Sequence, residues 1–115
     1  MKSLIAILTF AAPLFVHANI VSAQLDSSKK NIVMQVMHGG GCGKHEFSLQ
    51  LAGCFETSPV SCEAKLVHKT DDHCEAYIGS TVVLPLAQYG LNTKYYSGAS
   101  ITINYGSSKA TVPLP

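Results

Sequence analysis

The chain has no arginine and no tryptophan, and only 13% of its 115 residues are charged. Its eight lysines are scattered along the sequence and are balanced by seven acidic residues, which gives a formal net charge of +1. Proteins that bind a phosphate backbone or an anionic membrane surface do so with clustered lysine and arginine. The composition therefore predicts that nucleic acid is not a partner, and it gives no support for binding to a membrane surface.

The sequence also lacks an apolar run long enough to cross a membrane. Its longest run extends from Leu4 to Val16, about 13 residues interrupted by Pro13, whereas a spanning helix needs roughly 20. A lysine before this run and small residues after it are typical of a cleavable signal peptide. We expect residues 1–23 to be removed by cleavage after Ala23, with an alternative site after Ala18. The mature protein is then periplasmic or extracellular, without a membrane span.

What remains, residues 24–115, is the length of one domain. All four cysteines lie in this part, and an even number in an exported chain predicts two disulfides. A zinc site of four thiolates is disfavoured because no two cysteines have the close C-x-x-C spacing. No cysteine precedes Cys42, so a lipid-modified N-terminal cysteine is not expected.

The mature part shows no helical periodicity of useful length, and its apolar residues instead alternate over short segments separated by turn residues. We expect a loose lead-in over 24–30, one helical turn within 86–93, and strands over 31–38, 46–52, 61–69, 74–86 (one bent strand or two short strands hinged at Gly79), 94–96, 99–105 and 110–114. The prediction is an all-β single domain, a small β-sandwich or partly open barrel stapled by two disulfides.

Four cysteines allow three pairings. A bond from Cys42 to Cys54 is disfavoured, because the strand between them would hold its ends about 20 Å apart, whereas disulfide Cα atoms lie within roughly 7 Å. The favoured pairing is nested, with Cys54 bonded to Cys62 and Cys42 bonded to Cys74, as in two rungs of one antiparallel hairpin.

The nested pairing requires one irregularity in this hairpin. In an unbroken register the apolar faces of the two strands disagree, and a β-bulge at Gly53 restores the agreement. With the bulge we expect three pairs of opposite residues, namely Leu51 with Ala64, Leu49 with Leu66, and Phe47 with His68.

Two groups of candidate metal ligands lie at one end of this hairpin. The first is Met34, Met37, His38 and His45, which have the side chains that copper accepts. The second is His68, Asp71, Asp72 and His73, since zinc binds histidine and carboxylate. We predict that a zinc or copper ion, if one binds, is held by His38, His45, His73 and Asp71, with His68 as a further candidate. The alternative interpretation is that the methionines fill the core and the aspartates form a solvated turn.

Catalytic motifs are missing. The sequence contains no G-x-S-x-G nucleophile elbow, and the glycine run 39–43 continues with Lys44 and His45 instead of the Lys-Ser or Lys-Thr of a phosphate-binding loop. We therefore expect a protein that is not an enzyme.

The segment from Tyr96 to Leu114 resembles the end of the periplasmic C-type lysozyme inhibitors, which are small β-barrels with a Ser-Gly-Ala loop. The resemblance implies that Ser97, Gly98 and Ala99 form an inhibitory loop. It covers a short part of the chain and lacks the tryptophan of that family, so the chain is not assigned to it.

The function expected from the sequence is that of an exported, non-catalytic binding module of unknown partner. Its candidate interaction residues are Tyr95, Tyr96, Ser97 and Gly98, because tyrosine offers amphipathic contact area. A metal-binding protein is the second candidate, and an inhibitor of an extracellular enzyme is the third.

Overall fold

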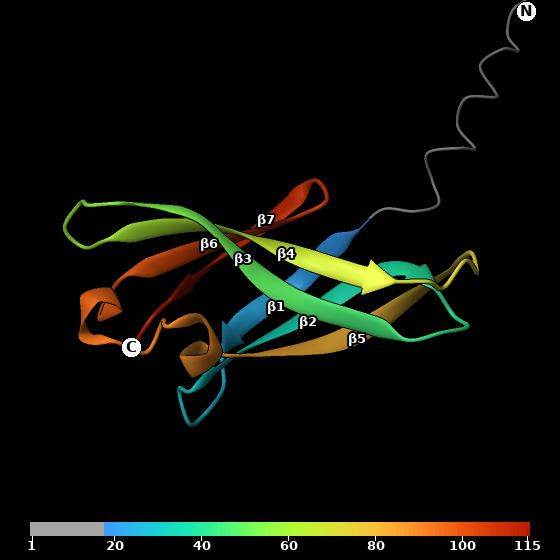
Figure 1. Cartoon of the computed structure of the whole chain (residues 1–115), viewed down its shortest axis with the longest axis horizontal. Coiled ribbons are helices and arrows are strands. Elements are labelled where there is room, and N and C mark those ends of the chain that lie inside the picture. The colour runs from blue at the N-terminus through green and yellow to red at the C-terminus, as the bar shows by residue number, and fades with distance from the viewer. Residues whose placement is uncertain (1–17) are drawn as a thin grey trace, which may run out of the picture.

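The structure, a computed structural model, describes residues 18–115 and consists of two β-sheets (Figure 1). The three-stranded sheet has the order β1-β2-β5, and the four-stranded sheet has the order β3-β4-β6-β7. The strands are β1 (Asn19–Leu25), β2 (Asn31–Gly40), β3 (His45–Phe55), β4 (Ser61–Thr70), β5 (Ala76–Pro85), β6 (Ser100–Tyr105) and β7 (Ser108–Pro113). All neighbouring strands are antiparallel except β4 and β6. The predicted all-β class is confirmed.

The core lies between the two sheets and is built by the alternation of apolar side chains along each strand. In β2, for example, Ile32, Met34 and Val36 are buried while Gln35 is exposed. Residues of both sheets and of the connection between β5 and β6 complete one continuous cluster, among them Leu49, Leu66, Leu84, Leu86, Leu91, Ile101, Ile103 and Val112. Met34 therefore packs in the core, whereas Met37 lies on the opposite face of β2 and is only half-buried.

The long β3–β4 hairpin has the register that the sequence predicts. Leu51 lies opposite Ala64, Leu49 opposite Leu66 and Phe47 opposite His68, and the register shifts between Leu51 and Gly53. Gly53 has φ +153°, a conformation that suits glycine because it has no Cβ.

The two disulfides lie at the two ends of this hairpin. Cys54 bonds Cys62 at the closed end of the hairpin, and Cys42 bonds Cys74 between the loops that flank its open end. This is the nested pairing, and it occupies all four cysteines of the sequence.

The two sheets meet along one side, where β1 lies beside β7 (Figure 1). The backbone N–H of Ile20 donates to the hydroxyl of Ser108 at 2.8 Å on this side. On the other side the edge strand β3 is bridged by the 3-10 helix η2 (Leu86–Tyr89), because the hydroxyl of Tyr89 accepts the backbone N–H of Leu49 at 3.2 Å.

Two expectations about individual segments need correction. The lead-in expected over 24–30 is wrong for residues 24 and 25, which are the last two residues of β1. The rest of β1, residues 19–23, belongs to the segment expected to be a signal peptide. Residues 1–17 of that segment lie outside the described part of the chain. Residues 94–96 form a 3-10 turn, η3 (Lys94–Tyr96), instead of a strand. Of the two alternatives for 74–86 the structure shows the single strand, β5, which continues through Gly79 because this glycine pairs with Met37, whose sulfur fills the space beside it. The helical turn expected within 86–93 is present as η2.

Candidate metal centre

Three histidines from three strands converge where the two sheets meet the open end of the β3–β4 hairpin. His38 lies on β2, His45 begins β3 and His68 is near the end of β4. One nitrogen of each ring lies within 4.8 Å of a nitrogen of each other ring. The ring centroids are 4.6 to 4.9 Å apart.

The alternation of the strands explains why these rings point inward. His38 continues the buried series of Met34 and Val36, and it is itself only 2% exposed. His45 shares its face of β3 with Leu49, and His68 shares its face of β4 with Leu66. The three imidazoles therefore extend the core instead of lying on the surface.

Four side chains form a continuous chain of hydrogen bonds through two of these rings. The hydroxyl of Tyr105 lies 3.0 Å from Nδ1 of His68, whose Nε2 lies 2.7 Å from Nδ1 of His45. Nε2 of His45 in turn lies 2.8 Å from the carboxylate of Asp72. Because a carboxylate only accepts, His45 donates from Nε2, His68 donates from Nε2 to His45, and Tyr105 donates to His68.

The third ring, His38, has its own pair of partners. Its Nδ1 donates to the backbone carbonyl of Gly39 at 2.9 Å, and its Nε2 accepts from the hydroxyl of Ser80 on β5 at 2.7 Å. The Nδ1 bond fixes the ring orientation and leaves Nε2 with a lone pair.

Aromatic side chains close the cluster on the core side. Phe47 stacks on the ring of His68, with centroids 4.4 Å apart and an interplanar angle of 14°. It also meets His38 and Tyr105 edge-on. Burial against these rings lowers the pKa of His68, and the nearby His38 and His45 lower it further. Burial likewise raises the pKa of Tyr105. His68 therefore favours neutral imidazole, which is the form that binds metal ions.

Asp72 supplies the negative charge of the site. Its side chain is fully covered, and its carboxylate accepts the backbone N–H of Cys42 and Gly43, both at 2.8 Å, and that of Cys74 at 2.9 Å. These bonds, of which the one from Cys42 contributes most, and the bond from His45 hold the pKa of Asp72 well below its usual range. The carboxylate is therefore ionised beside His45.

The structure brings together only part of the predicted ligand set. His38 and His45 meet as predicted, but Asp71 and His73 are exposed and lie outside the cluster, where His68 and Asp72 take their places. The cause is a local turn, in which the N–H of Asp72 donates to the hydroxyl of Thr70 and the carboxylate of Asp72 points inward. His68 was the further candidate, and the predicted pairing of Phe47 with His68 already implied that it faces the core.

A second group of ligand atoms, Cys42, Asp72 and Cys74, lies beside the first. The two sulfurs are joined in a disulfide and are not available as thiolate ligands in this form. Only the three histidines therefore offer a metal site in the oxidised protein, among the residues described.

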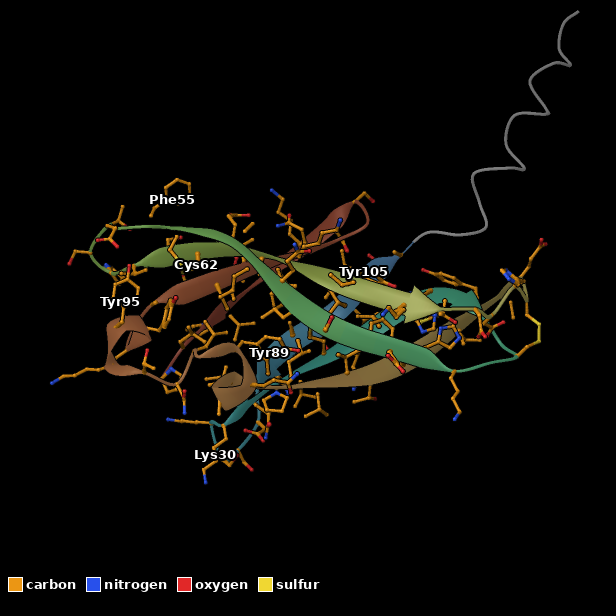
Figure 2. The ribbon with its side chains drawn as sticks, viewed as in Figure 1. Lys30, Phe55, Cys62, Tyr89, Tyr95 and Tyr105 are labelled. Carbon is orange, nitrogen blue, oxygen red and sulfur yellow. A yellow bond between two sulfur atoms is a disulfide. The ribbon has the colours of Figure 1, made fainter. Side chains whose placement is uncertain are left out.

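The predicted interaction residues lie at the other end of the molecule. Tyr95 is 48% exposed, Ser97 and Gly98 are exposed, and Tyr96 packs against the core. Figure 2 shows Tyr95 at the same end as Phe55, which is 63% exposed. The hydroxyl of Tyr95 donates to Glu56, which connects η3 to the tip of the β3–β4 hairpin.

Within residues 18–115, none of the helices has the length and apolar character needed to cross a membrane. A comparison with protein-family models finds no family that matches the chain, and a search of curated proteins finds none that matches it.

Proposed function

We propose that this protein binds one Zn²⁺ or Cu²⁺ ion through His38, His45 and His68. The observation that carries the proposal is that each ring has one nitrogen held by a non-metal partner, and that one nitrogen of each ring lies within 4.8 Å of a nitrogen of each of the other two rings. The holding partners are the carbonyl of Gly39, the carboxylate of Asp72 and the hydroxyl of Tyr105. Metal-binding histidines almost always have such a second partner.

The ligand atoms in this proposal are Nε2 of His38, Nδ1 of His45 and Nε2 of His68. Binding requires His68 to move its proton from Nε2 to Nδ1, where the oxygen of Tyr105 can accept the hydrogen bond. The hydroxyl of Ser80 gives up its bond to His38 at the same time. Tetrahedral ligands at about 2.0 Å from zinc are about 3.3 Å apart. The rings of His45 and His68, now 2.7 Å apart at these nitrogens, need only a small separation.

Three imidazoles suit both ions, and a water molecule is the natural fourth ligand. The two disulfides are compatible with an oxidising, exported location, and the N-terminal signal expected from the sequence belongs to the same proposal. We therefore place metal binding in the periplasm or the extracellular medium, in a small two-sheet sandwich that does no catalysis.

The test is titration of zinc and copper into the metal-free protein, with affinity measured by competition with a chromophoric chelator. We expect micromolar or tighter binding of one ion per chain, and an increase in melting temperature by mass action. His45→Ala and His68→Ala should each weaken binding at least tenfold. His73→Ala is the matched control, because His73 is exposed nearby and outside the cluster, and it should change nothing. Absence of binding to the wild-type protein, or equal loss in the control, contradicts the proposal.

A second candidate function is the interaction module expected from the sequence. It is favoured by the exposed aromatic side chains of Phe55 and Tyr95 beside the loop of Ser97 and Gly98. The double change Phe55→Ser and Tyr95→Ser should abolish capture of an envelope partner without lowering the melting temperature. C-type lysozyme is the enzyme to assay for inhibition, and no loss of its activity at saturating protein rejects the inhibitor.

A further inference from the structure

One carboxylate connects the histidine cluster to the exposed disulfide. Asp72 accepts hydrogen bonds from the ring of His45 and, with the same oxygen, from the N–H groups of Cys42 and Gly43. Its other oxygen accepts the N–H of Cys74. Asp72 is therefore bound to the backbone of both cysteines that form the disulfide.

The two loops that meet at Asp72 have little else to hold them together. The loop between β2 and β3 contains a run of glycines, and Gly40 and Gly41 have φ values of +147° and +115°. Apart from the bonds to Asp72, the described part of the chain has one side-chain hydrogen bond here, from the hydroxyl of Thr70 to the carbonyl of Lys44 at 2.7 Å. The disulfide is thus the covalent connection that keeps the glycine-rich loop over Asp72.

The two disulfides differ in accessibility. Cys42 is exposed and its partner Cys74 is half-buried, whereas Cys54 is half-buried and its partner Cys62 is completely buried in the core. Exposure allows a thiolate to attack the Cys42–Cys74 bond, since thiol exchange requires access to a sulfur atom. The bond next to the metal site is therefore the more reducible one.

We propose that the Cys42–Cys74 disulfide is a redox control of the metal site, so that the oxidised protein binds Zn²⁺ more tightly than the reduced protein. This inference rests on the proposed function. The redox step is exchange with two molecules of a monothiol such as glutathione: the Cys42–Cys74 bond breaks, two cysteine thiols form, and the two monothiols leave as one disulfide. Two electrons and two protons pass from the monothiols to the protein.

The coupling acts through His45. With the disulfide broken, the glycine-rich loop regains conformational freedom and withdraws the N–H groups of Cys42 and Gly43 from Asp72. The carboxylate then no longer fixes the tautomer and orientation of His45. Loss of such a second partner typically lowers metal affinity 10–100-fold.

The first test compares two serine pairs. Cys42→Ser with Cys74→Ser should weaken zinc binding about tenfold or more. Cys54→Ser with Cys62→Ser removes the disulfide at the far end of the hairpin and is the control, for which we expect unchanged affinity. Circular dichroism and a thermal melt establish that each variant is folded. If the wild-type protein binds zinc and the first pair binds it equally well, the redox control is wrong although the metal site stands.

The second test needs no variant and uses thermodynamic reciprocity. If oxidation tightens zinc binding tenfold, saturating zinc must lower the reduction potential of the Cys42–Cys74 couple by about 30 mV. The potential is measured in glutathione buffers by alkylation and peptide mass, with and without zinc. If zinc instead raises the reduction potential, zinc prefers the freed thiols of Cys42 and Cys74 beside Asp72, and the proposal is overturned. A reduction potential that zinc leaves unchanged also overturns it. Failure of the wild-type protein to bind any zinc instead rejects the proposed function itself.

Discussion

Nε2 of His45 lies 2.8 Å from the carboxylate of Asp72, although the two residues are 27 positions apart in the sequence. The contact is possible because no side chain intervenes at Gly40. A Cβ at this position would lie 2.7 Å from the ring of His45 and 2.9 Å from the carboxylate. Gly40 at the end of β2 therefore makes room for the hydrogen bond between His45 of β3 and Asp72 of the turn after β4.

Gly40→Ala should weaken zinc binding, because the added methyl group separates the ring from the carboxylate that orients it. We expect a loss of about tenfold, as for the removal of a second-sphere partner. Competition with a chelator measures the change. Gly90→Ala is a control for a positive-φ glycine with open space around it, and it should leave the affinity unchanged.

Gly53→Val should lower the free energy of unfolding by about 1–3 kcal/mol, because the bulge requires φ +153° there. No atom lies within 4 Å of the added Cβ, so the loss reports backbone conformation alone. The adjacent exposed residue provides the control, and Ala52→Val should stay within about 0.5 kcal/mol of wild type. Urea denaturation measures both, and equal stability of the two variants contradicts a strained bulge.

Acid should destabilise the turn between β1 and β2 through Asp26. Hydrogen bonds, first of all from the side chain of Asn31, lower the pKa of Asp26 from 3.8 to about 2. Since the folded pKa lies below the unfolded one, the carboxylate stabilises the fold above pH 4, and this contribution is lost as the pH falls toward 2. Asp26→Asn should remove this part of the pH dependence in thermal melts between pH 2 and 5. A melting curve with the wild-type pH dependence would falsify this assignment.

Tyr89→Phe should cost about 0.5–1.5 kcal/mol of stability, because the backbone N–H of Leu49 on the edge strand then loses its acceptor. The local effect is more specific than the global one. Hydrogen exchange of the Leu49 amide should accelerate, whereas the amide of Leu66, within the same sheet, should follow only the global change. Unchanged exchange at Leu49 would mean that this hydrogen bond does not form in solution.

The role of β1 predicts where the signal peptide expected from the sequence is cleaved. Processing after Ala23 would remove residues 19–23, which pair with β2 and contact β7. Processing after Ala18 keeps the whole strand, so we expect the exported protein to begin at Asn19. Intact mass of the secreted protein measures this directly, and a mass that begins at Gln24 contradicts it.

The sequence was most informative where the alternation of apolar residues and the spacing of the cysteines constrain the same segment. The cysteine spacing and the inward-facing positions of Leu49 and Leu66 together specified the register of the β3–β4 hairpin and required one β-bulge in it. Gly53 was the only residue there that suits a bulge. Periodicity says nothing about a turn, so the inward rotation of Asp72 instead of Asp71 could not be predicted. The strand β1 was missed because its small and apolar residues are also those that a signal peptidase recognises.

The contact of β1 with β7 joins the first and the last strand of the described chain. A protein that crosses a membrane N-terminus first exposes β1 well before β7 emerges, and long-range strand pairing is slow to form. Only the hairpins that are local in sequence can assemble during this interval. The two sheets cannot join along that side until β7 has emerged, so under the proposed export the topology itself delays closure of the core until the chain has left the compartment in which it was made.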